Sequence, residues 1–329
     1  MKALVTGGAG FIGSYLTEAL LESGHAVSVI DDLSTGRLGN LRRSRSFPGF
    51  RFTRGSIEDR KTLGRLVDRC DVVYHLAAVV GVKLVIEKPV RTLRANLRGT
   101  ETVLELAGRR KKPVLIASTS EVYGKSLKAK FAETDDLLIG PPTVGRWSYA
   151  CSKATDEFLA LSYWKEKKQP VVIARIFNTV GPRQTGRYGM VVPTLVRQAV
   201  RGETITVFGD GRQKRCFNHV EDTVSALVSL MEDPACRGQI FNVGNDREIS
   251  ILDLAKLVKK MTRSRSRIKI IPYHEAYEEG FEDMLRRVPD LAKLRRRTGY
   301  RPRRTLEEIL RDVIDFESRA RRTPRTTLS

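Results

Sequence analysis

Cysteine, histidine and tryptophan are scarce in this chain. Among its 329 residues, four are Cys, four are His and two are Trp. The cysteines are Cys70, Cys151, Cys216 and Cys236. They form no C-x-x-C pair, which argues against a zinc ribbon and a disulfide framework, so we interpret them as reduced thiols. His219 and His274 lack partners at the spacing of a metal site, and we expect no metal ion.

Long apolar runs are also absent. No stretch approaches the roughly 18–20 apolar residues that a membrane span needs, so we expect no membrane association. Met1-Lys2 leads directly into the apolar segment Ala3-Leu4-Val5, which argues against a signal peptide. The sequence therefore predicts a cytoplasmic protein.

Acidic residues are few relative to basic ones. The chain has 59 Lys and Arg against 38 Asp and Glu, a net charge of +21, and part of the excess is local to residues 286–329. Nucleic-acid binding uses basic residues on one face, interleaved with aromatics and carried by a recognisable motif, and we find no such motif. We therefore favour a solvated surface that attracts small anionic substrates over a nucleic-acid partner.

Short apolar segments alternate with helix-length segments through the first half of the chain. Strand patterns cover residues 2–6, 26–30, 50–53, 71–75, 114–118 and 171–175. This alternation implies right-handed crossovers and a parallel sheet covered by helices on both faces. The predicted fold class is α/β, with a Rossmann-type doubly wound parallel sheet.

A glycine-rich segment, Thr6-Gly7-Gly8-Ala9-Gly10-Phe11-Ile12-Gly13, follows the first predicted strand and opens the first predicted helix. Such glycines form a tight turn and let backbone N–H groups approach a pyrophosphate at the positive helix end. Asp31 follows about 20 residues later, where a carboxylate accepts hydrogen bonds from an adenosine ribose. Because this carboxylate would repel a 2′-phosphate, the pattern predicts NAD rather than NADP.

Tyr149 and Lys153 form a second motif, in Tyr149-Ala150-Cys151-Ser152-Lys153. A spacing of four residues places the phenol and the ammonium on one face of a helix. Tyrosine titrates near pH 10, and a close cation stabilises its phenolate as a general base. Alone this spacing is weak, but together with a dinucleotide motif it predicts a catalytic pair.

The regular alternation of strand and helix patterns ends near residue 178. Shorter, mixed elements follow, with helices expected at 191–201, 222–231, 251–261 and 306–316, a strand at 205–208 and a basic tail after about 318. We therefore expect an NAD-binding domain over residues 1–177. Residues 178–329 are expected to form mainly a smaller α/β substrate-binding lobe, with some segments returning to the first domain.

These motifs resemble the extended short-chain dehydrogenase/reductase superfamily, in its branch of nucleotide-sugar epimerases, dehydratases and decarboxylases. The resemblance runs from the glycine segment to about Arg304. The further segments that carry it are His75-Leu76-Ala77-Ala78, Asn96 before Gly99-Thr100, Ser118-Thr119-Ser120-Glu121-Val122-Tyr123-Gly124, and Arg175-Ile176-Phe177-Asn178-Thr179-Val180-Gly181-Pro182-Arg183. The resemblance also implies a homodimer, because the helices expected at 91–107 and 149–165 match those that pair in family dimers.

The resemblance implies a role for each matching residue. The implied catalytic residues are Thr119, Glu121, Tyr149 and Lys153. The implied NAD-binding residues are Gly7, Gly10, Phe11, Ile12, Gly13, Asp31, Asp32, Ser34, Thr35, Gly36, Ser56, Ile57, Leu76, Ala77, Ala78, Asn96, Ser118, Tyr149 and Lys153. The implied substrate-binding residues are Val80, Thr119, Ser120, Asn178, Arg183, Arg187, Val191, Val207 and Arg215.

Ser120 bears on the choice of reaction. Related 4,6-dehydratases have Asp between Thr and Glu as an acid for water elimination, and serine cannot donate a proton as a carboxylic acid does. Common 4-epimerases usually have a small residue where Glu121 stands. The Thr-Ser-Glu pattern, with Arg215 in the segment 207–217, most resembles UDP-glucuronate decarboxylases. Met190 departs from them, because close decarboxylases often have Arg there, and so does the segment 140–147.

The implied reaction begins with transient oxidation at the sugar C4. Tyr149, with its pKa lowered by Lys153, takes the C4 hydroxyl proton while hydride passes to the nicotinamide, and Thr119 holds the C4 oxygen. The resulting β-keto acid of UDP-glucuronate loses carbon dioxide, aided by Glu121, to give UDP-xylose or its 4-keto form. The main alternative is a UDP-sugar 4-epimerase acting on UDP-glucose or UDP-glucuronate. A 4,6-dehydratase and a non-catalytic NAD-binding protein rank below it.

Overall fold

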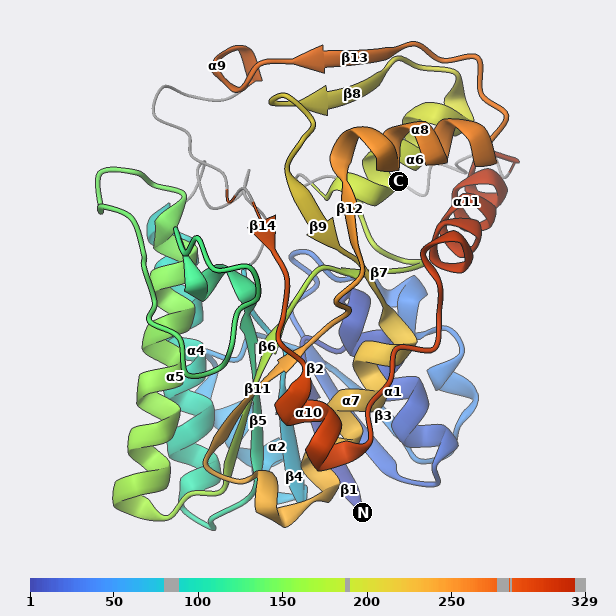
Figure 1. Cartoon of the computed structure of the whole chain (residues 1–329). Coiled ribbons are helices and arrows are strands. Elements are labelled where there is room, and N and C mark those ends of the chain that lie inside the picture. Colours follow the sequence, from blue (N-terminus) through green and yellow to red (C-terminus); the bar gives the residue numbers. More distant parts are fainter. Residues whose placement is uncertain (80–88, 187–189, 277–283, 285, 323–329) are drawn as a thin grey trace.

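The computed structural model describes all residues except 80–88, 187–189, 277–283, 285 and 323–329. A seven-stranded sheet with the order β11-β6-β5-β4-β1-β2-β3 forms its centre, and every neighbouring pair is parallel. Its strands are β1 (Lys2–Thr6), β2 (Ala26–Asp31), β3 (Phe50–Arg54), β4 (Val72–His75), β5 (Val114–Thr119), β6 (Val171–Ile176) and β11 (Gln239–Val243). The strand order reverses between β1 and β4, so the predicted Rossmann-type doubly wound fold is confirmed (Figure 1).

Helices cover both faces of this sheet. On one face lie α1 (Phe11–Glu22) and α7 (Val220–Glu232), and on the other lie α2 (Arg60–Asp68), α4 (Pro89–Gly108) and α5 (Trp147–Lys167). Burial on both faces explains why the inner strands β1, β4, β5 and β6 are largely apolar, whereas the edge strand β3 alternates.

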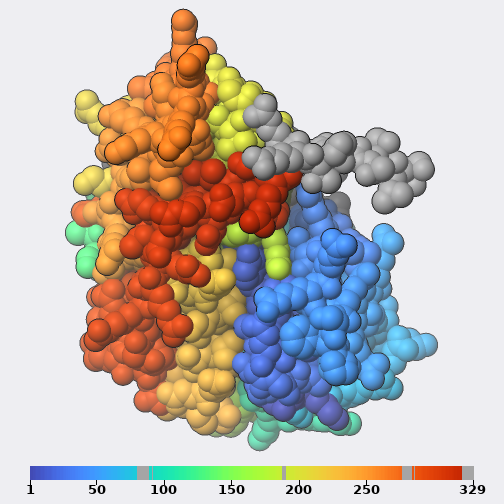
Figure 2. Space-filling view, turned by 90° about the vertical axis from the view of Figure 1, so that its right-hand side faces the viewer, coloured from blue at the N-terminus to red at the C-terminus, as the bar shows by residue number. Residues whose placement is uncertain are grey.

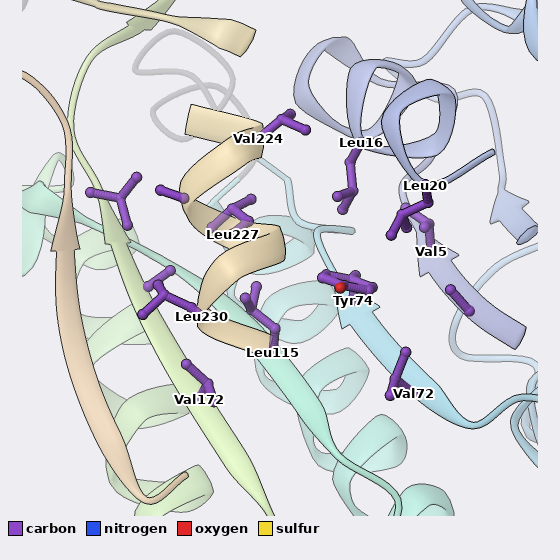
Figure 3. Close-up of a cluster of buried hydrophobic side chains, with 14 of the residues drawn as sticks. Val5, Leu16, Leu20, Val72, Tyr74, Leu115, Val172, Val224, Leu227 and Leu230 are labelled. Atoms are coloured by element: carbon purple, nitrogen blue, oxygen red, sulfur yellow. The ribbon is translucent and has the colours of Figure 1, made fainter. Parts of the chain in front are cut away.

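Figure 3 shows the first of these two interfaces. Leu16 and Leu20 of α1 and Leu227 of α7 converge on Tyr74 and Leu115 of the sheet. All five side chains are at most 1% exposed. This core fixes α1 against the strand ends, and the glycine-rich segment lies directly before that helix.

A smaller group of elements lies above the carboxyl ends of the strands (Figure 1). Its core joins α6 (Val191–Arg201), α8 (Ile251–Met261) and α11 (Leu306–Arg322) to β8 (Ile205–Phe208), which pairs with β13 (Ile268–Ile271). Its remaining strands are β7 (Thr179–Val180), β9 (Lys214–Cys216), β10 (Asn218–His219), β12 (Glu248–Ser250) and β14 (Arg286–Arg287). The other helical elements of the described chain are η1 (Leu38–Leu41), η2 (Ser44–Ser46), η3 (Ser120–Tyr123), η5 (Pro234–Cys236), α9 (Tyr273–Ala276) and α10 (Ala292–Thr298).

The C-terminal helix is longer than expected. It was expected to end near residue 316 with a tail after about 318, yet α11 continues to Arg322. Ile309, Leu310 and Val313 are buried in the core of the small lobe and fix α11 there. The helix then continues past these residues to its end at Arg322. Figure 2 shows the red C-terminal segments against the yellow and orange lobe, reaching the blue N-terminal half.

The second half of the chain returns to the main sheet, because β11 extends its edge beside β6 and α7 covers one face. A domain boundary between residues 177 and 178 stays a prediction. In the part of the chain that the structure describes, none of the helices combines the length and apolar composition that crossing a membrane requires.

Candidate active site

The carboxyl ends of the parallel strands open into a cavity of about 680 Å³, which the small lobe closes from above. Open α/β sheets bind ligands at this edge, beside the point where the strand order reverses. The residues with an expected cofactor role that line the cavity are Gly7, Gly10, Phe11, Ile12, Gly13, Asp31, Asp32, Ser34, Thr35, Ser56, Ile57, Leu76, Ala77, Ala78, Ser118 and Tyr149. Two expected substrate residues, Val80 and Arg187, lie outside the described residues.

The glycine-rich segment is tight at two positions. Gly7 has φ +70°, and a Cβ there would stand 2.8 Å from the backbone nitrogen of Ala77. A Cβ on Gly13 would stand 2.3 Å from the carbonyl oxygen of Gly7. The following helix α1 has no side chain capping its N-terminus. Its first N–H groups and its dipole therefore favour an anionic group at this end of the cavity.

Asp31 ends β2 beside the glycine segment. Its carboxylate accepts hydrogen bonds from the backbone N–H groups of Ala9, at 2.9 Å, and Leu33, at 2.8 Å. Burial raises the pKa of Asp31, while these N–H groups act in the opposite direction. Gly36 keeps the facing loop close, because a Cβ there would lie 2.8 Å from Asp31 Oδ1. An uncapped helix and a carboxylate at this spacing fit the pyrophosphate and ribose of a dinucleotide.

Asn96 and Gly36 have expected cofactor roles but are not among the cavity-lining residues. Asn96 accepts a hydrogen bond from the N–H of Val79 at 2.8 Å and donates to Ser152 Oγ at 3.3 Å. It thereby ties the segment after β4 to α5, which carries Tyr149.

Tyr149 lies where the sheet edge meets the small lobe, beside Thr119 at the end of β5. In the chain alone the pKa of Tyr149 is raised rather than lowered, and the expectation that Lys153 favours the phenolate stays a prediction. Burial raises the pKa of Tyr149, and the negative charges of Glu121 and Asp156 raise it further. A hydrogen bond with Thr119 and the charge of Arg287 act in the opposite direction.

Lys153 shares the helix face of Tyr149, but its ammonium has another partner. Nζ donates to Asp156 Oδ2 at 2.7 Å, and the two side chains are 2% and 0% exposed. Lys153 is not among the residues lining the cavity. The spacing of Tyr149 and Lys153 therefore correctly predicted that they share a helix face. The Lys153 ammonium, however, pairs with the carboxylate of Asp156, three residues later.

A second buried ion pair fastens α5 to the sheet. Arg175 of β6 donates from Nη2 to Glu157 at 2.7 Å and from Nε at 3.0 Å. Glu157 also accepts a hydrogen bond from Ser118 Oγ of β5 at 2.5 Å. Three neighbouring elements are thereby fixed around the first turns of α5, where Tyr149 stands.

Arg287 is a cavity residue that sequence reasoning missed. Its Nη1 lies 3.5 Å from both Ser120 Oγ and Glu121 Oε1. Strand β14 places Arg287 in register beside Arg215 of β9, and both arginines line the cavity. The local sequence holds many arginines, so only the strand pairing distinguishes this one.

The expected substrate residues fall into two groups. Those lining the cavity are Thr119, Ser120, Asn178, Arg183, Val191 and Arg215. Val207 is fully buried in the core of the small lobe, and its strand neighbours Thr206 and Phe208 line the cavity instead. Because side chains alternate along a strand, the cavity contact expected at Val207 is made by the residues on either side of it, Thr206 and Phe208.

Arg183 is held by the N-terminal half of the chain. Its Nη2 pairs with Glu18 Oε2 at 3.0 Å, and its Nη1 donates to Ser14 Oγ at 3.1 Å. Its guanidinium also stacks over the Tyr15 ring at 4.4 Å. Arg183 therefore links the segment after β7 to α1 as well as lining the cavity.

Comparisons with known proteins match the sequence and the fold of this chain. A model of the family described as GDP-mannose 4,6 dehydratase matches residues 4–313. A UDP-N-acetyl-alpha-D-glucosaminuronate decarboxylase of Bacillus cytotoxicus is 39% identical, over 96% of this chain and 97% of that protein. UDP-glucuronic acid decarboxylase 1 of Danio rerio is 36% identical, over 97% of this chain and 73% of that protein. The structure of UDP-glucuronic acid 4-epimerase from Bacillus cereus, with UDP-glucuronic acid and NAD, has a TM-score of 0.87 and 29% identity, over 97% of this chain and 100% of that one.

Proposed function

Because the chain belongs to the GDP-mannose 4,6 dehydratase family of extended short-chain dehydrogenases/reductases, we propose that it is an NAD-dependent decarboxylase of a UDP-hexuronate. UDP-glucuronate is the proposed substrate, and UDP-xylose or its 4-keto form is the proposed product. Relatives named as decarboxylases, at 36% to 39% identity over nearly the whole chain, support this choice.

One observation carries the proposal. Glu121 and Arg287 lie 3.5 Å apart in the cavity that also holds Tyr149. A 4,6-dehydratase needs an acid at position 120, where this chain has Ser120. A guanidinium suits a carboxylate substrate, because its planar fork donates to two oxygens. The site therefore combines a base for a hydroxyl with a cation suited to the neighbouring carboxylate.

The chain supplies binding, orientation and proton transfer. When bound in the glycine-rich cradle beside Asp31, NAD would supply a hydride acceptor for C4 and, where UDP-xylose is the product, a hydride donor back to the same carbon. Tyr149 takes the proton of the C4 hydroxyl, and Thr119 holds the oxygen. A ketone at C4 makes the C6 carboxylate a β-keto acid, so the C5–C6 bond breaks and its electron pair delocalises into the ketone. Glu121 orients the sugar and relays a proton to C5.

The arginine pair gives the substrate end of the cavity its charge. A UDP-hexuronate carries a pyrophosphate and a carboxylate, and Arg215 and Arg287 stand side by side on β9 and β14. We assign Arg215 to the nucleotide side and Arg287 to the carboxylate side, because Arg287 is the one next to Glu121.

A second candidate substrate follows from one relative. The Bacillus cytotoxicus protein, at 39% identity, is named for UDP-N-acetylglucosaminuronate, which has the same C4 hydroxyl and C6 carboxylate. The proposed chemistry at C4 and C6 is unchanged by an acetamido group at C2. The two substrates are therefore to be compared directly.

Mass spectrometry of the products tests the proposal. We expect purified protein incubated with UDP-glucuronate to release carbon dioxide and form UDP-xylose or its 4-keto form. Recovery of UDP-galacturonate alone, or conversion of UDP-glucose to UDP-galactose without decarboxylation, would identify a 4-epimerase and overturn the proposal. A greater kcat/KM for the N-acetylated substrate would reassign the substrate within the same reaction.

We extend the proposal to assembly and location. Two copies pair through α4 and α5, and the exposure of Phe158 on α5, at 69%, supports an apolar contact there. Phe158→Asp is expected to yield monomers in analytical ultracentrifugation, and an unchanged dimer would overturn this assignment.

We also propose a cytoplasmic location, which cell fractionation tests. We propose that the partner is a nucleotide sugar rather than nucleic acid, which a binding assay with oligonucleotides tests.

A further inference from the structure

A buried carboxylate stands beside the lysine of the proposed catalytic pair. Asp156 follows Lys153 by three residues on α5, and its Oδ2 accepts a hydrogen bond from Nζ at 2.7 Å. The two side chains are 0% and 2% exposed. Exposed pairs of this kind interact weakly, whereas charges out of solvent are strongly coupled. The ammonium that the motif offers to Tyr149 is therefore already partly neutralised.

Two neighbouring elements enclose this pair. Burial raises the pKa of Asp156, while the Lys153 ammonium and a hydrogen bond with Thr100 of α4 act in the opposite direction. Thr100 Oγ1 also lies 3.2 Å from His75 Nε2 of β4, and His75 Nδ1 lies 2.8 Å from Thr6 Oγ1 of β1. Burial and the charge of Lys153 lower the pKa of His75 to about 3, so the ring adds no charge near neutral pH. Thr100 and His75 thus enclose the pair without adding a charge to it near neutral pH.

Asp156 also acts on Tyr149 directly. The two residues are seven positions apart, so they lie on one helix face and are separated by about 10 Å along the axis. The other charged groups that face Tyr149 are Glu121 of η3 and Arg287 of β14. Glu157 adds a second negative charge beside Asp156. Charges on α5, η3 and β14 therefore act on the phenol, and Thr119 of β5 adds a hydrogen bond.

We propose that Asp156 is a positioning residue that fixes the direction of the Lys153 ammonium and cancels part of its charge, and so sets the pH at which Tyr149 loses its proton. This inference rests on the proposed role of Tyr149 as the base. A unit charge at about 10 Å, in a medium with an effective dielectric constant of about 20, displaces a proton equilibrium by about one pH unit. Asp156 thus moves the working range of the base to higher pH.

Asp156→Asn tests the proposal, because asparagine is nearly isosteric and keeps an acceptor for Lys153. Tyrosinate absorbance is titrated in the NAD-loaded protein, and the signal of Tyr149 is the difference between each protein and its Tyr149→Phe version. We expect the midpoint of the Tyr149 titration to fall by about one pH unit. The acid limb of the pH profile of kcat/KM should move to lower pH by the same amount. An unchanged or higher midpoint overturns the proposal.

Three further variants separate charge from structure. Asp156→Ser, a second neutral replacement, is expected to lower the midpoint as asparagine does. Lys153→Met/Asp156→Asn removes both charges, and its midpoint should lie above that of Asp156→Asn. A double variant that keeps the low midpoint overturns the proposal, because the shift then has a structural origin. Glu166→Gln, on the exposed end of α5, is the control with an unchanged midpoint.

The two readouts distinguish this inference from the proposed function. If no UDP-sugar is turned over, the proposed function fails, while the absorbance titration still decides the role of Asp156. If decarboxylation is observed and the midpoint does not move, only the role of Asp156 fails.

Discussion

Replacing Arg175 by methionine is expected to destabilise the protein by about 3–5 kcal/mol, because it leaves the carboxylate of Glu157 buried without its cation. The two side chains are only 4% and 3% exposed. The substitution removes hydrogen bonds to Glu157 at 2.7, 3.0 and 3.2 Å and one to the carbonyl oxygen of Glu133 at 3.2 Å. It also removes the stacking of the guanidinium 4.7 Å above the Tyr123 ring. Ser118 still donates to Glu157, which places the expected loss in the lower part of that range.

Urea denaturation followed by tryptophan fluorescence measures this loss. Both tryptophans, Trp147 and Trp164, lie on α5, so the signal reports the helix that the ion pair holds. Arg175→Met/Glu157→Gln should recover part of the loss, because it removes the unpaired charge as well.

A surface pair gives the matched control. Lys256 and Asp253 are paired with 61% and 62% of their side chains exposed, so Lys256→Met should change the free energy of unfolding by less than about 1 kcal/mol. The reasoning is refuted if Arg175→Met changes stability no more than this control does.

Three shorter predictions concern the cofactor, the base and pH. Gly13→Ala should abolish NAD retention, because its Cβ would meet backbone atoms at 2.3 and 2.8 Å. Gly39→Ala, where the Cβ has open space, should retain NAD. Equal cofactor content in both purified variants would contradict this account of the glycine-rich segment. Tyr149→Phe should abolish turnover while leaving NAD affinity nearly intact, and full activity in a product assay would exclude Tyr149 as the base. His75 has its pKa lowered from 6.5 to about 3, so its contribution to stability is present above pH 6.5 and is lost as the pH falls toward 3. The free energy of unfolding of the wild type, from urea denaturation, should therefore decline over this range by up to about 1.4 kcal/mol per pH unit more than that of His75→Gln, and parallel declines would contradict it.

Local patterns were enough to predict several of the regular elements. The sequence placed α6, α8 and β8 at the bounds that the structure has, because each carries its own apolar periodicity. Ser250, for example, caps α8 by accepting a hydrogen bond from the N–H group of Asp253. The alternation of these elements was also sufficient for the doubly wound topology.

The parts that the sequence did not predict depend on contacts between distant segments. Strand β14 has two residues and exists by pairing with β9, and that pairing alone selects Arg287 from a run of arginines. Strand β11 likewise joins the sheet through β6. The direction of the Lys153 ammonium is different, because Asp156 stands three residues away in the sequence. The spacing of these two residues was an available signal that Lys153 has a competing partner.

The account depends most directly on transient oxidation at C4. A single-turnover experiment with UDP-glucuronate carrying deuterium at C4 would follow nicotinamide absorbance, carbon dioxide and the position of the label together. We predict that reduced nicotinamide forms before carbon dioxide is released. The label is then found on the nicotinamide, or back at C4 of UDP-xylose. Release of carbon dioxide without any reduced nicotinamide at any time, and with the label never leaving C4 of the sugar, would contradict the account.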